Sequence, residues 1–414
     1  MVGLGNEQKN NSNKIYIVLF LYWFILVVWQ NITSAQNKGM LDVVLKVGLL
    51  GFLFICFLLN SKGINQNKFV YILLALTCFC LTAVVEKRFS LGVAVSYLFP
   101  LIFAFLCYCV GDDFCITEKH YLRYLNLIIF ATLYMVGYSF IFDFGKFKSA
   151  LSISSAYGNE LSSFFSSNHE YAMYLVFAIA GCLICLIKGS NTKFKKAFYL
   201  ISIALFLSNL ILTYSRTAML ACAVMITIFA VFDKSWIKKL IIFAVIILAL
   251  VVVCSSTLQN YIFQILLKGN NDAGRSELID VALSKFKGGS IFNKLFGFGY
   301  TETANYLVIE TTHESVHNAY LNTLLTNGIA GLSILVCLVI NNIVQAIKFI
   351  KVDRFYGAIF SGLAFSIAFF MLTNTAVIFN SPIDSSMMTV FAIIVPKFVR
   401  NAVFQSFING AQKD

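Results

Sequence analysis

The chain has 414 residues, of which 59% are hydrophobic and only 12% are charged, and its formal net charge is +12. Soluble domains contain about 25% charged residues, so this chain has too few polar side chains to cover a soluble surface. The composition excludes a soluble globular protein and a disordered chain, and it indicates a polytopic membrane protein. Basic loops of a membrane protein explain the positive charge better than a nucleic-acid partner does.

Apolar runs of membrane-spanning length recur from end to end. They predict an all-α polytopic membrane protein with about 12 transmembrane helices, which form a single transmembrane domain over residues 1–414. The expected spans are 15–30, 41–59, 69–85, 91–110, 122–142, 170–187, 197–214, 217–232, 239–254, 325–347, 356–379 and 385–397. Lysine and arginine favour the loops on the side of the N-terminus, which predicts that both termini are cytoplasmic (N-in/C-in).

Two external segments are longer than the other loops, and they cover residues 143–169 and 255–324. Long loops in compact proteins are usually functional, so we expect the larger loop to carry part of the active site. Within it, apolar residues at helical spacing predict an amphipathic helix that lies on the membrane surface. The face expected to meet the membrane consists of Leu278, Ile279, Ala282, Leu283 and Phe286.

Arg216 lies between two apolar runs, where burial of a guanidinium is costly. It either reaches the membrane interface, as such residues often do, or it binds an anion. A guanidinium suits the second role because its fork of donors matches phosphate oxygens and does not lose its charge. Arg275, at the start of the amphipathic stretch, poses the same alternative. Gly297 and Gly299 flank Phe298 and predict a tight turn or a close backbone approach. They do not form a dinucleotide-binding motif, because its third glycine is missing.

His313, Glu314 and His317 match the H-E-x-x-H spacing of zinc peptidases, in which two histidines share one face of a helix. No histidine follows His317 to supply a third ligand. The alternative is that His317 stands at the outer mouth of a membrane helix. There it is either a hydrogen-bonded interface residue or a base that takes a proton from a hydroxyl.

Taken in order, these motifs resemble those of the bacterial O-antigen polymerase/O-antigen ligase superfamily. The resemblance is sharpest over residues 211–335, and Asn168, just before a span, is similar to an external element of that family. After Gly274 and Arg275 the sequence departs from the family pattern, because aliphatic residues stand where the family has an aromatic one. The residues that carry the resemblance are Ser215, Arg216, Thr217, Ala218, Gly274, Arg275, Gly297, Phe298, Gly299, His317, Asn318, Tyr320, Leu321, Gly328, Gly331 and Leu332.

The resemblance implies a glycosyltransferase in the bacterial inner membrane, with its active site facing the periplasm. Its donor would be an oligosaccharide on undecaprenyl diphosphate, and transfer would invert the anomeric centre without a metal or a cofactor. His317 would be the catalytic base, and Arg216 and Arg275 would bind the diphosphate. The expected supporting residues are Asn318, Tyr320, Ser215 and Asn168.

Both branches of the superfamily share these motifs. We expect a polymerase of repeat units for O-antigen, capsule or exopolysaccharide, with an O-antigen ligase that delivers glycan to lipid A-core as the alternative. A transporter of lipid-linked glycans and a membrane zinc peptidase are lesser alternatives. The expected partners are the lipid-linked donor and acceptor, membrane lipids and a chain-length regulator. We do not expect a nucleic-acid partner.

Overall fold

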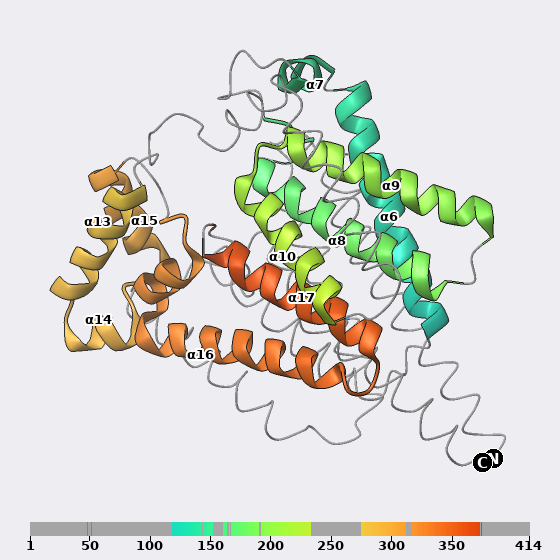
Figure 1. Ribbon diagram of the computed structural model, residues 1–414. Helices are drawn as coiled ribbons and strands as arrows, with labels where there is room; N and C mark the ends of the chain where they lie inside the picture. Colours follow the sequence, from blue (N-terminus) through green and yellow to red (C-terminus); the bar gives the residue numbers. More distant parts are fainter. Residues whose placement is uncertain are drawn as a thin grey trace, which may run out of the picture. The chain divides into compact units, whose positions relative to one another are not determined.

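The computed structural model describes residues 48, 51, 118–142, 144–151, 160–163, 165, 167–189, 192–232, 275–311, 316–372 and 374. Helices dominate these residues, and no strand occurs among them (Figure 1). The helices are α6 (Glu118–Ile141), α7 (Phe144–Leu151), α8 (Asn168–Lys188), α9 (Lys193–Leu212), α10 (Arg216–Phe232), α13 (Arg275–Gly288), α14 (Ile291–Phe296), α15 (Tyr300–Thr311), α16 (Ala319–Phe349) and α17 (Arg354–Met371).

Within the described residues, five helices are long and apolar enough to cross a membrane, namely α6 from Tyr121 onwards, α8, α9, α16 and α17. They confirm the all-helical prediction and overlap with the expected spans 122–142, 170–187, 197–214, 325–347 and 356–379, although α17 already ends at Met371. The expected span 217–232 is helix α10, which is apolar but has only 17 residues. Apart from residues 48 and 51, the expected spans 15–30, 41–59, 69–85, 91–110, 239–254 and 385–397 lie outside the described residues, so the count of twelve stays a prediction.

The chain divides into two compact units, and the first contains residues 121–271 and 343–370. Helix α8 forms its centre, because nearly every side chain from Tyr171 to Cys185 is buried. Two hydrogen bonds between side chains join its helices. The Tyr171 hydroxyl donates to Asn209 of α9 over 3.2 Å, and the Tyr199 hydroxyl of α9 donates to Asn126 of α6 over 2.8 Å. Inside a membrane such polar contacts help to fix how helices pack.

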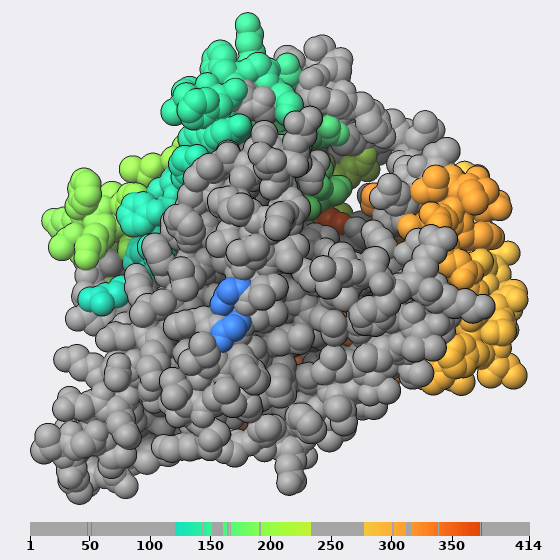
Figure 2. Space-filling model, turned by 180° about the vertical axis from the view of Figure 1, so that it is seen from behind, coloured from blue at the N-terminus to red at the C-terminus, as the bar shows by residue number. Residues whose placement is uncertain are grey.

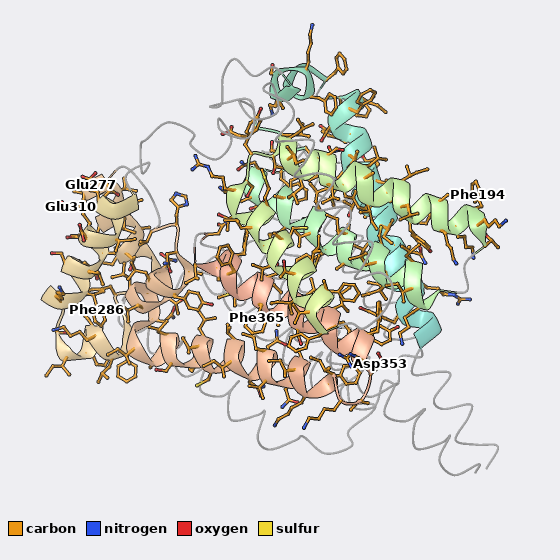
Figure 3. All side chains as sticks on the ribbon, viewed as in Figure 1. Phe194, Glu277, Phe286, Glu310, Asp353 and Phe365 are labelled. Atoms are coloured by element: carbon orange, nitrogen blue, oxygen red, sulfur yellow. The ribbon has the colours of Figure 1, made fainter. Side chains whose placement is uncertain are left out.

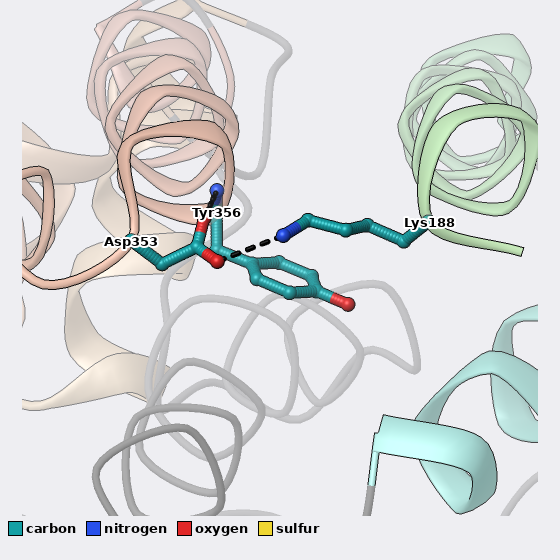
Figure 4. Close-up of polar contacts among 3 residues, drawn as sticks. All are labelled: Lys188, Asp353 and Tyr356. Atoms are coloured by element: carbon teal, nitrogen blue, oxygen red, sulfur yellow. Dashed lines mark hydrogen bonds and ion pairs between the residues drawn. The ribbon is translucent and has the colours of Figure 1, made fainter. Parts of the chain in front are cut away.

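An ion pair joins the end of α8 to the start of α17 at one end of this unit (Figure 4). The Lys188 ammonium lies 2.8 Å from a carboxylate oxygen of Asp353 and 4.7 Å from the centre of the Tyr356 ring. The other Asp353 oxygen accepts the Tyr356 backbone N–H over 2.9 Å and so caps α17. Figure 3 labels Asp353 and also Phe194, in the first turn of α9.

The contacts at the Lys188–Asp353 end of this unit show in which direction its helices run. Helix α8 ends at Lys188, and Arg354 donates to the carbonyl of Phe232, the last residue of α10. Both helices therefore end beside the start of α17, and both begin at the opposite end of the unit. That opposite end carries Asn168 and Arg216, the first residues of the two helices.

The second unit contains, among the described residues, 275–311 and 316–342, with α13, α14, α15 and most of α16. Its core consists of Leu278, Ala282, Phe298, Leu307, Val316 and Leu325. The prediction that the apolar face of α13 lies on the membrane surface is therefore wrong for Leu278 and Ala282. Both side chains are buried against other helices of the loop, because α15 and α16 supply an apolar partner that the sequence pattern of α13 alone does not show.

Candidate active site

Arg216 follows a sharp turn between α9 and α10. Thr213 ends α9, Tyr214 adopts a left-handed backbone with φ 53°, and α10 begins at Arg216 itself. The Thr213 hydroxyl accepts the Ser215 N–H over 3.3 Å, and the Ser215 carbonyl accepts the Met219 N–H over 3.0 Å. The turn leaves the Arg216 side chain partly exposed at the start of a helix, while Ser215 before it is buried.

The first turn of α8 contacts this turn directly. The side-chain amide of Asn168 donates to the Thr213 carbonyl over 2.8 Å. Nδ1 of His169 lies 2.8 Å from the Ser215 hydroxyl oxygen, within hydrogen-bond distance. The structure thus brings together Asn168, Ser215 and Arg216, three of the residues that the sequence singled out. Sequence reasoning assigned no role to His169, although its place beside Asn168 in a long external segment was a usable signal.

Two further contacts fix the same turn from the side of the loop after α6. The Tyr214 hydroxyl donates to the Ala150 carbonyl of α7 over 2.8 Å, and both residues are buried. The Leu161 N–H donates to the Leu212 carbonyl over 3.1 Å. The backbone before Arg216 is therefore held by α8, by α7 and by the segment between them. A side chain that starts from a fixed backbone is suited to bind a ligand with defined geometry.

In the second unit, His317 lies just before α16 and has a left-handed backbone with φ 51°. Its neighbour Val316 is buried in the core of this unit, whereas the imidazole is partly exposed. Asn318 accepts the Leu321 N–H through its side chain over 3.0 Å and so caps α16. Tyr320, partly buried, lies in the first turn of that helix. His317 thus stands just before a helix of spanning length, and its place at the outer mouth of that helix stays a prediction.

The same geometry bears on the H-E-x-x-H motif. Two histidines of a zinc peptidase share one face of a helix, which requires helical backbone at both. His317 has a left-handed backbone and precedes α16 instead. The helical arrangement expected for a zinc peptidase is therefore not formed at His317. His313 and Glu314 lie outside the described residues.

The segment with the paired glycines Gly297 and Gly299 is hydrogen-bonded to a kinked part of α16. Gly328 interrupts this helix with φ 68° and ψ −167°, and Gly297 has φ 90°. The Phe298 N–H donates to the Leu325 carbonyl over 2.8 Å, and the Gly299 N–H donates to the Thr326 carbonyl over 3.0 Å. The loop therefore satisfies carbonyls that the kink exposes. The turn and the close backbone approach predicted for these glycines are confirmed.

A cation and two aromatic rings hold α13 against α15. The Lys285 ammonium lies 3.1 Å from Glu302, 4.8 Å from the ring centre of Phe298 and 4.4 Å from that of Tyr306. These contacts fix α13, which begins at Arg275. The side chain of Arg275 lies outside the described residues, so its predicted part in the site is not tested.

The predicted site residues thus fall into two groups, one in each compact unit, and in each group a fixed helix start presents a polar side chain. The first group consists of Asn168, Ser215 and Arg216, to which the structure adds His169 beside Ser215, and the second of Arg275, His317, Asn318 and Tyr320. A guanidinium at a helix N-terminus suits a phosphate group, and a partly exposed imidazole can accept a proton.

The five apolar helices of spanning length define a multi-pass membrane protein of the all-α class. Two of them, α8 and α16, start at Asn168 and just after Asn318. Residues 200–336 match the model of the O-antigen ligase family. The matched segment contains Arg216, Arg275 and His317, and it confirms the resemblance to the O-antigen polymerase/O-antigen ligase superfamily. That family indicates an enzyme that transfers glycosyl groups. A comparison with curated proteins gave no significant match.

Proposed function

We propose that the protein polymerises oligosaccharide repeat units carried on undecaprenyl diphosphate, at the outer face of the bacterial inner membrane. The observation that carries this proposal is the turn at Arg216. Four hydrogen-bonding contacts, through Asn168, His169, Leu161 and Tyr214, fix the backbone there, and the guanidinium at its end stays partly exposed. An arginine that only reached for the membrane interface would not need such a support.

The position of Arg216 along its unit supports the same conclusion. Lys188 and Arg354 lie together at the other end of α8 and α10, where cytoplasmic loops are expected. Arg216 is thus separated from the basic residues that set orientation. With both termini in the cytoplasm, as we propose, this end is the side where a lipid carrier that has crossed the membrane would present its diphosphate.

The chemistry asked of these residues is a single displacement. A hydroxyl oxygen of the acceptor glycan attacks the anomeric carbon of the donor sugar, and the bond from that carbon to the diphosphate oxygen breaks with inversion. The diphosphate leaves with the electron pair, and Arg216 stabilises its growing negative charge together with Arg275. His317 takes the hydroxyl proton on a ring nitrogen. Arginine side chains supply the charge here, without a metal or a cofactor.

The matched family model favours a second candidate, because it describes O-antigen ligases. A ligase would use the same donor but deliver the glycan to lipid A-core. The two functions differ in the acceptor alone, so the residues assigned to the diphosphate and to the proton would be unchanged.

Reconstitution of the purified protein with lipid-linked repeat units tests the proposal. A ladder of longer lipid-linked glycans supports a polymerase, and transfer to lipid A-core alone supports a ligase. If neither product forms, both functions fail. Arg216→Lys should lower the rate at least 100-fold, because an ammonium does not reproduce the planar fork. Arg123→Lys, at an exposed position in α6, is the matched control and should keep the full rate.

A further inference from the structure

The end of α6 and the short helix α7 form an aromatic surface that the proposed reaction does not use. The side chains of Phe140, Phe142 and Phe144 are 53%, 72% and 52% exposed. The ring of Phe147 contacts Phe140 edge-on, with 5.3 Å between ring centres, and stacks on Phe144 at 6.5 Å. This part of the chain, teal in Figure 2, lies at the surface of the molecule.

Helix α7 has the pattern of a helix that lies in a membrane interface. Phe144 and Phe147 fall on one side of it. The exposed residue Lys148 borders that side, and the exposed residue Lys146 lies towards the opposite side. Aromatic rings collect at the level of lipid headgroups, and lysines beside them attract acidic phospholipids. Helix α7 also follows directly on a helix of spanning length, so it is placed where a bilayer surface must be.

We propose that the surface formed by residues 140–142 and 144–148 is a docking surface for acidic phospholipids of the leaflet next to Arg216. The apolar rings enter the interface, and the two lysines bind headgroup phosphates. The link to the site is the bond from the Tyr214 hydroxyl to the Ala150 carbonyl. Because Tyr214 lies two residues before Arg216, the depth of α7 in the membrane sets the depth of the arginine.

Brominated lipids, which quench tryptophan at known depths, test the position of this surface. Phe147→Trp is placed in the full-length protein in nanodiscs, and the emission of the parent protein, which has 3 tryptophans, is subtracted. We expect strong quenching by bromine near the headgroup and weak quenching by bromine deep in the acyl chains. Phe130→Trp is the control and should show the opposite preference. Phe130 is exposed on α6 and lies roughly 15 Å along that helix from Phe140, towards the middle of the span.

A comparison of brominated lipids that differ in their headgroup tests the lipid preference. At equal mole fraction, brominated phosphatidylglycerol should quench Phe147→Trp more than brominated phosphatidylcholine does. The excess should disappear when Lys146 and Lys148 are both changed to glutamine, since each lysine near an acidic surface raises lipid binding about fivefold. Equal quenching by both lipids would overturn the preference.

The quenching needs no turnover, so it separates this proposal from the proposed enzyme. Absence of quenching by any brominated lipid would show that another protein or a second copy covers the surface, and it would overturn the docking proposal. A deep pattern like that of Phe130→Trp would overturn it as well. The link to the site, which rests on the proposed function, is tested by Tyr214→Phe. This variant should raise the KM for the lipid-linked donor several-fold with little change in kcat, and an unchanged KM would refute the link.

Discussion

Replacement of Gly328 by alanine should strongly destabilise the second unit. The backbone at this position, with φ 68° and ψ −167°, belongs to a region that only glycine adopts readily. A built Cβ would overlap with the backbone of Leu295 and Phe296, so the methyl group would also push the two chains apart. Gly297, with φ 90°, faces the Thr326 backbone in the same way.

The size of the effect follows from these contacts. Holding alanine in that backbone region costs about 1–3 kcal/mol. Separation of the two chains weakens the hydrogen bonds from Phe298 and Gly299 to the kinked helix, each worth about 1 kcal/mol. The free energy of unfolding should therefore fall by about 3–5 kcal/mol in Gly328→Ala, and by a similar amount in Gly297→Ala.

Unfolding of the purified protein in a mixed micelle, followed as the fraction of SDS rises, measures this loss. Gly288→Ala is the matched control, because a Cβ built at Gly288 meets nothing within 4 Å. The double variant of Gly297 and Gly328 should lose less unfolding free energy than the two single variants together, since both substitutions disrupt the same backbone contact. A loss in Gly328→Ala as small as that of the control, or fully additive losses, would refute the reasoning.

Three further predictions concern the site and its frame. His317→Asn should abolish glycan transfer in the reconstituted assay without loss of folding, because asparagine tolerates the left-handed backbone but does not serve as a base; full activity would exclude a general base there. Asn168→Ala should lower transfer about tenfold through the lost bond to Thr213, and an unchanged rate would show that the turn does not need it. Asp353→Asn, which keeps the cap on α17 but removes the ion pair, should destabilise the protein less than Asp353→Ala, which removes both; equal losses of unfolding free energy would contradict this.

Much of the helical frame could be predicted from the sequence, because runs of apolar residues report membrane helices directly. The errors lie where polar residues extend a helix. The span expected at 325–347 begins at Ala319 instead, since Asn318 caps it and the core of the second unit buries Asn322 and Thr323 in its first turns. Hydropathy alone assigns such residues to the loop.

The arrangement of the candidate site depends on contacts that no local pattern shows. Asn168 and Thr213 are 45 residues apart, and their hydrogen bond is formed only because α8 and α9 pack as neighbours. The family resemblance named Asn168 but gave no reason for it, and it left His169 without a role. The glycine pair was readable as a turn, whereas its partner, the kink at Gly328, required the folded backbone.

Each of the two groups of the candidate site contains strained backbone. Among the described residues, the non-glycine residues with positive φ are Ser163, Tyr214 and His317, with values of 53°, 53° and 51°. Tyr214 lies two residues before Arg216, and His317 is the expected base. Such conformations cost of order 1 kcal/mol or more and persist where surrounding contacts hold them. Here the Tyr214 hydroxyl is bound to Ala150 and Val316 is buried beside His317, so the fold holds strained backbone next to the arginine and at the histidine to which we assign the chemistry.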